Sequence, residues 1–406
     1  MKNNCSHLAI LTINDFLKNL NRINYSKLTG RSYHCVKGVL RWYLLLESVH
    51  IKLCKKPLKE KKLAHTILLV GIYQVLFLNI KKNIVINELL ASARKLGLNN
   101  LCGFFNSTIR QVQPLNIKDV ELNNYISRQI KKDWPQFFDY ISTINFSSPP
   151  ICLNLINPSE FHIKNKNHKL FKAFKFIGDN CVVLPDDIKL NSVLGLEQGD
   201  FYIQNISAQY IKDIIKLLPL GANIEVLDAC CGVGGKAIAA NQVLRSNASI
   251  TALDNNSTQI KIFKENIKKY NIEIKEVICD DLNKFSGQKF DLIMLDAPCS
   301  ASGNIRKYPE LHFRTNKEEL EKLNKLQAEL INSAFKLLRP GGFLIYMTCS
   351  IFKSENDLTI AKFLASNDKA QCHFLDDFPN RSEFGYQILG TESKLGYFYS
   401  IINNLA

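Results

Sequence analysis

The sequence predicts a helical amino-terminal domain, a small α+β connector and a doubly wound α/β domain with a parallel sheet at its centre. A chain of 406 residues is too long for one ordinary hydrophobic core. Apolar residues recur at helical spacing up to about residue 130, whereas short apolar runs alternate with helical stretches after Gly221. We therefore expect domains over residues 1–130, 131–200 and 201–406.

The first 130 residues predict helices that pack through one apolar face. The clearest segments are INDFLKNLNRI, VLRWYLLLESVHIKLC and INELLASARKLG, in which apolar residues return every three or four positions. The most apolar window, HTILLVGIYQVLFLNI, spans 16 residues and is interrupted by Gly71, Tyr73 and Gln74. It is short for a membrane span, so it predicts a core helix.

The composition, with 46% hydrophobic and 22% charged residues, is typical of a folded globular protein. The amino terminus has no long apolar stretch followed by a small-residue cleavage site, so a signal peptide is not expected. We expect a cytoplasmic protein without membrane contact. Residues 151–200 show a mixed, short-ranged pattern, which favours a small α+β unit.

The positive charge is concentrated in the first third of the chain. The formal net charge is +15, and residues 1–150 carry 22 Lys and Arg against 8 Asp and Glu. Residues 151–406 carry 30 against 29. A lysine-rich composition on solvated helices would place positive charge in both parts of the chain alike. The segregation therefore favours a polyanionic partner, namely nucleic acid.

Five short apolar runs after Gly221 predict the strands of the α/β domain. Helical stretches such as NSTQIKIFKENIKKY lie between several of them, and this alternation predicts a parallel sheet. The runs, each ending in an acid or a cysteine, are NIEVLDAC, SITALD, KEVICDD, DLIMLDAP and GGFLIYMTCS. Ligands of such sheets bind beyond the carboxyl ends of the strands, so these terminal residues predict one shared site.

The segment VLDACCGVGGKA predicts a strand, a glycine-rich turn and a helix that can approach a ligand closely. It lacks the spacing of a phosphate loop, so by itself it indicates no more than a nucleotide-like ligand. Asp254 follows the second run and is suited to ribose hydroxyls or, alternatively, to capping the next helix. Of Asp280 and Asp281, one is expected to meet an adenine amino group, while the other caps a turn or faces solvent.

The twelve cysteines are scattered singly apart from Cys230-Cys231. No C-x-x-C pair or Cys/His cluster indicates a metal site, so we expect none. Two cysteines differ from the rest, because Cys299 and Cys349 each follow the end of a buried strand. A single cysteine is most often a small buried hydrophobe, so it is the pair in this context that predicts chemistry.

These motifs resemble the RNA (cytosine-5)-methyltransferases that use S-adenosylmethionine, and among them the RsmB (Sun/Fmu) type, which modifies a cytosine in bacterial 16S ribosomal RNA. The resemblance covers nearly the whole chain and is carried by IQNISAQ, LDAPCSASGNIRKYPELHF, QAELINSAFKLLRPGG and YMTCSIFKSEN. In the first third, GVLRW, GIYQVLFL and FFNSTIRQ resemble the NusB-like helical domain, an RNA-binding fold in this family. The resemblance implies a Rossmann-like methyltransferase domain preceded by a NusB-like domain.

The reaction of that family explains why two cysteines are needed. Carbon 5 of cytosine is a poor nucleophile, and a thiolate that adds to carbon 6 turns the ring into an enamine whose carbon 5 can attack a methyl group. The resemblance assigns the nucleophile to Cys349, in T-C-S, and release of the 5-methylcytosine product to Cys299, in D-A-P-C. Asp296 is expected to hydrogen-bond the cytosine edge and stabilise the adduct.

The resemblance also implies which residues bind S-adenosylmethionine and RNA. Asp254 is expected on the ribose, Asp280 near the adenine and Asp296 near the sulfonium. Arg306 and Lys307 either meet an RNA phosphate or are ordinary solvated charges. The loop around the methionine part is expected to consist of Cys230, Cys231, Gly232, Val233, Gly234, Gly235 and Lys236. The expected partner is 16S ribosomal RNA, free or in a partly assembled small subunit, and the expected state is a monomer.

The chain departs from the family pattern in ways that keep alternatives open. The usual D-x-C-A-A-P-G-G-K-T loop here has Cys231, Gly232, Val233 and Ala237, which removes a proline and a threonine hydroxyl and is expected to weaken cofactor binding. Asn205 and Leu395 each stand where the family has aspartate. The alternatives are a transfer RNA cytosine-5 methyltransferase and a catalytically impaired RNA-binding protein of the same fold. A DNA enzyme is disfavoured because Ser300, and not glutamine, follows Cys299.

Overall fold

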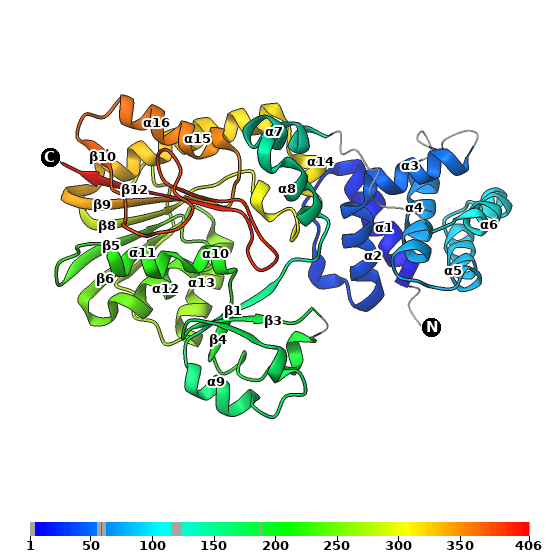
Figure 1. Ribbon diagram of the computed structural model, residues 1–406, viewed down its shortest axis with the longest axis horizontal. Helices are drawn as coiled ribbons and strands as arrows, with labels where there is room; N and C mark the ends of the chain where they lie inside the picture. Colours follow the sequence, from blue (N-terminus) through cyan, green and yellow to red (C-terminus); the bar gives the residue numbers. More distant parts are fainter. Residues whose placement is uncertain (1–4, 55–57, 59–61, 115–123, 187, 406) are drawn as a thin grey trace. The chain divides into compact units, whose positions relative to one another are not determined.

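The computed structural model describes residues 5–54, 58, 62–114, 124–186 and 188–405 of the chain (Figure 1). The chain divides into two compact units. The first comprises residues 1–127 and 308–314, and the second comprises residues 128–307 and 315–406. The first unit is helical, whereas the second contains all the strands described.

The helical unit packs around α4 (Lys62–Leu76), which is buried at every position from Ala64 to Gln74. This is the apolar window that the sequence assigns to a core helix. The other long helices of the unit are α1 (Cys5–Asn19), α2 (Gly30–Arg41), α3 (Tyr43–Leu53), α5 (Lys82–Lys95) and α6 (Cys102–Gln111). Among the described helices of the chain, none is long and apolar enough to cross a membrane.

A segment from much later in the chain completes the helical unit. Residues 308–314, which include the short helix α14 (Leu311–Arg314), belong to this unit by their contacts. Phe313 packs against its core, with ring centroids 5.6 Å from Phe16 and 4.9 Å from Tyr43, both edge to face. The helical unit is therefore not formed by a continuous stretch of sequence.

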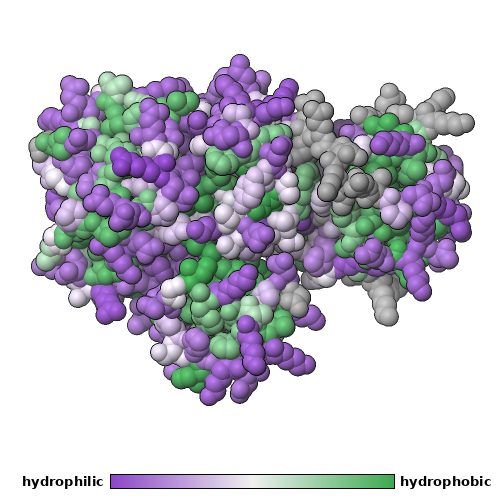
Figure 2. Space-filling view, in the orientation of Figure 1, coloured by the Kyte–Doolittle hydropathy of each residue, from purple (hydrophilic) through white to green (hydrophobic). Residues whose placement is uncertain are grey.

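The second unit begins with α7 (Tyr125–Asp133, which starts in the first unit) and α8 (Phe138–Asn145), followed by a small antiparallel sheet. Its strand order is β2-β3-β1-β4, and α9 (Pro158–Asn165) packs on it through Phe161. The strands are β1 (Ile151–Leu155), β2 (Lys175–Ile177), β3 (Cys181–Leu184) and β4 (Phe201–Ile203). Figure 2 shows hydrophobic surface over this region, where Phe176, Ile177 and Ile203 are exposed.

The main sheet contains five parallel strands in the order β9-β8-β5-β6-β7, extended by antiparallel strands beside β9. The parallel strands are β5 (Ile224–Ala229), β6 (Ala248–Leu253), β7 (Glu276–Ile278), β8 (Phe290–Asp296) and β9 (Leu338–Thr348). The antiparallel strands are β10 (Ala370–Cys372), β11 (Tyr386–Ile388) and β12 (Tyr397–Asn404). The five apolar runs of the sequence are the five parallel strands.

Helices cover both faces of this sheet (Figure 1). One face packs against α11 (Ile211–Leu217), α12 (Gly235–Leu244) and α13 (Ser257–Lys269), and the other against α15 (Lys317–Lys336) and α16 (Asp357–Ala365). Alternate residues of β8 face opposite sides, with Met294 in one core and Leu295 in the other. The predicted fold class, a helical domain and an α+β connector ahead of a doubly wound sheet, is confirmed.

Candidate functional site

The residues that the sequence assigns to a site gather at the carboxyl edge of the parallel sheet. Asp254 directly follows β6, Asp296 is the last residue of β8, and Cys349 directly follows β9. Strands β8 and β9 are neighbours with Asp296 opposite Met347. Because parallel strands end at the same edge, residues separated by almost one hundred positions share one crevice there.

Backbone hydrogen bonds hold the glycine-rich loop between β5 and α12. The Cys231 N–H donates to the Leu253 carbonyl at 3.0 Å. The Gly232 N–H donates to Oδ2 of Asp254 at 2.9 Å. The loop is therefore fixed to the end of β6, and the Asp254 carboxylate lies against it.

The same loop depends on left-handed backbone conformations. Cys230, Gly232 and Gly234 have φ values of 60°, 54° and 97°. At Gly234 a Cβ atom would lie 2.9 Å from the ring of Phe263, so a side chain there would combine backbone strain with a clash. The loop leads directly into the amino terminus of α12, whose free N–H groups favour a carboxylate or another anion.

Asp280 and Asp281 both follow β7 and differ in exposure. Asp281 is half-buried, and its Oδ1 accepts the Asn283 N–H at 3.0 Å, which stabilises a turn. Asp280 is exposed, and its Oδ1 accepts the Asp281 N–H at 2.7 Å. Asp281 thus has the capping role, which leaves Asp280 as the better candidate for an adenine contact.

Asp296 is held by two groups that the strands bring to it. Lys236 Nζ lies 2.5 Å from Oδ2, and the Tyr397 hydroxyl donates to Oδ1 at 3.1 Å. Burial alone would lower the pKa of Lys236, but the Asp296 carboxylate more than offsets this and holds that pKa above its ordinary value. Asp296 is thus oriented by a charged and a neutral donor. Tyr397, which comes from antiparallel strand β12, was not among the site residues that the sequence predicted.

Asp228 on β5 is a further acid that motif reasoning left out. Its side chain is fully buried, and burial raises its pKa to about 7. Lys236 favours its charged form, whereas Asp296 opposes it. Asp228, Lys236 and Asp296 therefore form one electrostatically coupled group beneath the crevice. The first position of the family loop pattern is this aspartate, so the signal was present in the sequence.

The two motif cysteines meet in the crevice. Their Sγ atoms are 3.5 Å apart, and neither forms a disulfide. The hydrogen bond to Cys349 and burial together raise the pKa of the Cys299 thiol well above its ordinary value. The sequence placed both cysteines at strand ends, and the structure brings them into direct contact.

A buried carboxylate, Glu355, ties the two cysteine loops together. Its Oε1 accepts the Ser300 N–H at 2.7 Å, and its Oε2 accepts the Ser300 hydroxyl at 2.5 Å and the Ser350 hydroxyl. Gln327 Nε2 donates to Oε1 at 3.0 Å and to the Pro298 carbonyl at 2.8 Å. Burial raises the pKa of Glu355. Because Ser300 follows Cys299 and Ser350 follows Cys349, this carboxylate fixes both thiols through their neighbours.

Two departures from the family pattern contact each other. The Asn205 Oδ1 accepts the Leu395 N–H at 3.1 Å and the Ser207 N–H at 2.9 Å. The Ser207 hydroxyl in turn donates to the Leu395 carbonyl at 2.6 Å. Asparagine thus supplies the acceptor oxygen that aspartate would supply, while Leu395 is buried. These replacements preserve a structural contact and remove no residue from the crevice.

The two cations expected at RNA differ in exposure. Arg306 is only 5% exposed, and its guanidinium donates to the carbonyls of Ser148, Thr391 and Glu392. Its guanidinium joins two backbone segments, at Ser148 and at Thr391 and Glu392, so Arg306 is neither the solvated charge nor the exposed phosphate contact that the sequence suggested. Lys307 is exposed, and its RNA contact stays a prediction.

Comparisons with known proteins find relatives for both parts of the chain. The family model described as 16S rRNA methyltransferase RsmB/F matches residues 215–400, and the NusB family model matches residues 10–114. Ribosomal RNA small subunit methyltransferase B of Vibrio vulnificus is 30% identical, over 90% of this chain and 88% of that protein. A probable ribosomal RNA small subunit methyltransferase B of Coxiella burnetii is 29% identical, over 98% and 95%.

Solved structures share the fold. The crystal structure of PH0851 covers 99% of both chains with a TM-score of 0.77 and 18% identity. NSun6 from Pyrococcus horikoshii, solved with SFG, covers 69% of this chain and 98% of its own, with a TM-score of 0.59 and 16% identity. These likenesses concern the fold, whereas sequence identity over most of both chains decides the family. The chain belongs to the ribosomal RNA small subunit methyltransferase B family.

Proposed function

We propose that this chain transfers a methyl group from S-adenosylmethionine to carbon 5 of a cytosine in 16S ribosomal RNA, through a covalent cysteine–cytosine adduct. The observation that carries the proposal is the pair of thiols, 3.5 Å apart at the ends of adjacent parallel strands and beside Asp296. The names of the bacterial relatives support ribosomal RNA as the substrate. The fold neighbour solved with SFG, an S-adenosylmethionine analogue, supports the cofactor.

The residues present fit S-adenosylmethionine. Asp254 offers a carboxylate to ribose hydroxyls, and Asp280 lies exposed beyond the next strand for the adenine. Gly232 leaves open space where a side chain would stand, since only Gln259 Oε1 comes within 4 Å of its added Cβ. The amino terminus of α12 suits the carboxylate of the methionine part. When bound, the cofactor supplies an electrophilic methyl group.

Cys349 opens the reaction in this proposal. Its thiolate sulfur forms a bond to carbon 6 of the cytosine, and the electrons of the 5,6 double bond become available at carbon 5. Asp296 faces the cytosine nitrogen edge and stabilises the protonated ring, while Lys236 and Tyr397 keep the carboxylate oriented. Carbon 5 would then take the methyl group while the bond between that methyl group and the cofactor sulfur breaks, and it would still carry its hydrogen.

Cys299 completes the reaction. Its thiolate removes the proton from carbon 5, the electron pair re-forms the 5,6 double bond, and the bond between carbon 6 and the Cys349 sulfur breaks. Cys349 leaves as a thiolate, and Cys299 ends as a thiol. Both cysteines are thus needed for turnover, but only Cys349 is needed to form the adduct.

Bisulfite sequencing tests this function. A 16S ribosomal RNA transcript is incubated with S-adenosylmethionine and either the wild-type chain or the Cys349→Ala variant. One cytosine that becomes protected with the wild type and not with the variant is the expected result. Protection only in transfer RNA would establish the alternative substrate. Binding of RNA without methylation of ribosomal or transfer RNA would establish a catalytically impaired protein.

A further inference from the structure

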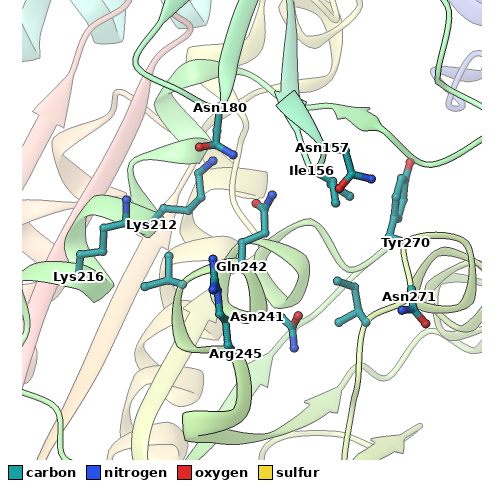
Figure 3. A pocket seen from close by; sticks show the side chains of 12 residues that line it. Ile156, Asn157, Asn180, Lys212, Lys216, Asn241, Gln242, Arg245, Tyr270 and Asn271 are labelled. Carbon is teal, nitrogen blue, oxygen red and sulfur yellow. The ribbon is translucent and has the colours of Figure 1, made fainter. Parts of the chain in front are cut away.

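A polar pocket lies at the opposite edge of the sheet from the cysteines, between the small antiparallel sheet and the helices α11 and α12 (Figure 3). Its volume is about 670 Å³. Ile156 and Asn157, just after β1, line one side, and the carboxyl-terminal end of α12 and Tyr270, just after α13, line others. Every lining residue belongs to the second unit of the chain.

Three cations from two elements line this pocket. Lys212 and Lys216 are one helical turn apart on α11 and so share a face, and Arg245 follows α12. In the described part of the chain, no carboxylate lines the pocket and none pairs with these three side chains within 4.0 Å. Asp213, the neighbour of Lys212 on α11, favours the charged form of Lys212 but does not line the pocket. The pocket lining therefore carries an excess of positive charge, which attracts an anion.

Lys212 is held in place before any ligand binds. Its Nζ donates to Oδ1 of Asn154 at 2.9 Å, and the Asn154 amide donates to the Tyr202 hydroxyl at 2.7 Å. Burial lowers the pKa of Lys212 to about 8. An anion beside it would favour the charged form again, so part of the electrostatic cost of this partly buried lysine is recovered on binding.

Arg245 adopts a backbone conformation that is unfavourable for a residue with a side chain. Its φ is 50° and its ψ is −132°, a combination that favours glycine.

Gln242 and Tyr270 add a hydrogen-bond acceptor and an aromatic ring to the charged lining of the pocket. Gln242 Nε2 donates to the Leu155 carbonyl at 3.0 Å, while its Oε1 is buried without a hydrogen-bond partner among the residues described. Such an acceptor suits a hydroxyl or an amino group. In Figure 3 the Lys212, Gln242 and Asn180 side chains converge, and the Tyr270 ring stands across the pocket from them, where it offers a stacking surface.

We propose that this pocket binds a segment of single-stranded RNA backbone, with Lys212, Lys216 and Arg245 contacting phosphate and Gln242 and Tyr270 contacting ribose or base. The proposal rests on the proposed function, because it extends the path of the RNA substrate. Helix α12 runs from the cofactor loop to this pocket, and its ten residues span about 15 Å. The pocket therefore lies about one helix length from the cofactor loop, and the RNA must reach it over the surface of the second unit, because α12 itself has no exposed residue.

The test compares two triple variants of the full chain that lose the same charge. The pocket variant is Lys212→Gln, Lys216→Gln, Arg245→Gln, and the control is Lys317→Gln, Lys322→Gln, Lys325→Gln on the exposed side of α15. Fluorescence anisotropy with labelled oligouridylate is expected to show about tenfold weaker binding for the pocket variant only. Its affinity should also depend less on salt, with a slope of log K against log salt that is smaller by about one to two.

A charge-keeping variant, Lys212→Arg, Lys216→Arg, Arg245→Lys, should restore most of the affinity and so exclude misfolding as the cause. Equal affinity of the pocket and control variants would overturn the proposal. Titration of adenosine monophosphate and of inorganic phosphate forms a separate arm. Saturable binding of either one, with RNA affinity unchanged in the pocket variant, would show a small-anion site instead and would also overturn it.

Methyl transfer is measured separately, so the two proposals can fail independently. If the wild type binds oligouridylate through the pocket but methylates no RNA, the proposed function fails and the pocket proposal stands. If the wild type methylates RNA and the pocket variant keeps its affinity, the pocket proposal fails alone. With both proposals correct, the pocket variant shows a raised KM for RNA and an unchanged kcat at saturation.

Discussion

Cys299 holds its proton more firmly than an ordinary thiol, and the cause lies in its partner. The hydrogen bond that the Cys299 thiol donates to Cys349, burial and the charge on Cys349 all raise the pKa of Cys299. Once Cys349 is bonded to cytosine it no longer carries that charge, so two of these contributions vanish and the pKa of Cys299 falls. In the proposed reaction, adduct formation therefore prepares Cys299 to lose its proton to solvent and then to act as the base.

Substitution of the two cysteines should separate adduct formation from release. Cys299→Ala is expected to accumulate a covalent protein–RNA complex, because the methylated adduct cannot lose its carbon 5 proton. Cys349→Ala should form none, because the nucleophile is gone. A denaturing gel with labelled 16S ribosomal RNA measures the complex, and Cys279→Ala, at an exposed cysteine after β7, serves as the matched control. Reversed phenotypes would mean that the two roles are exchanged.

Glu355 is expected to control activity although it lies behind the reacting thiols. Glu355→Ala leaves the Ser300 N–H and the Ser300 and Ser350 hydroxyls without their acceptor, so both cysteine loops can shift. Because misplacement by about 1 Å can cost about 100-fold, we expect kcat to fall by that order with little change in KM for the cofactor. Steady-state kinetics with RNA and S-adenosylmethionine measures both quantities.

Two further variants decide how Glu355 acts. Glu355→Gln keeps one acceptor for the Ser300 N–H and an amide that can donate to the hydroxyls, so it should restore most of kcat. Glu383→Ala makes the same change as Glu355→Ala at an exposed position and should be neutral. If Glu355→Ala lowered the melting temperature and left kcat as in the wild type, the carboxylate would serve stability alone.

At the scale of elements, the turn from β5 into α12 is expected to decide cofactor affinity. Gly234→Ala places a Cβ 2.9 Å from the Phe263 ring at a φ of 97°, so it should destabilise the loop by about 1–2 kcal/mol and weaken S-adenosylmethionine binding. Calorimetric titration measures that affinity. Gly221→Ala is the control, because no atom lies within 4 Å of its Cβ, and it should bind as the wild type does. Equal affinity of both variants would contradict a dependence on the turn.

The sequence predicted the parallel strands of the main sheet but not its antiparallel strand β12. The parallel strands β5 to β9 are continuous apolar runs because helices cover both of their faces, and this pattern is visible locally. Strand β12 is equally buried, but it is defined by its antiparallel pairing with β9, whose paired residues lie 50 to 60 positions earlier in the chain. Pairing over that distance leaves no local signal, so the position of Tyr397 beside Asp296 could not be predicted.

At the scale of the whole chain, the helical unit draws on two separate parts of the sequence. Residues 308–314 follow the D-A-P-C motif closely, yet Phe313 packs in the helical core and the Tyr25 hydroxyl donates to Glu310 at 2.5 Å. The helical spacing of apolar residues predicted that the amino-terminal domain ends near residue 130. That prediction could not include residues 308–314. A segment of seven residues is too short to show a repeating apolar pattern, so its sequence does not reveal which core it packs in.

His312 in that segment should make the helical unit sensitive to acid. Burial first, and then Arg41, lower the pKa of His312 from 6.5 to about 4, and the Asn124 amide lies 3.1 Å from its Nδ1. Between these two pH values the unfolded chain binds a proton that the folded chain does not. Stability conferred by the neutral imidazole is therefore present above pH 6.5 and is lost as the pH falls toward 4, by about 3 kcal/mol.

Urea unfolding at several pH values measures this loss. His312→Gln keeps an acceptor for Asn124 without a titrating group, so its stability should fall less between pH 6.5 and 4 than that of the wild type. Identical slopes for the two proteins would show that His312 does not account for the acid sensitivity.

The sequence by itself determined the fold class, the glycine-rich loop and the two cysteines, because periodicity, glycine and motif spacing are properties of neighbouring residues. Only the tertiary structure decided that the thiols touch, that Glu355 and Tyr397 serve the crevice, and that Arg306 is buried in a bracing role. It also assembled Lys212, Lys216 and Arg245 around one pocket. These facts depend on which strand ends and helix ends meet in space, and packing between segments far apart in the chain decides that.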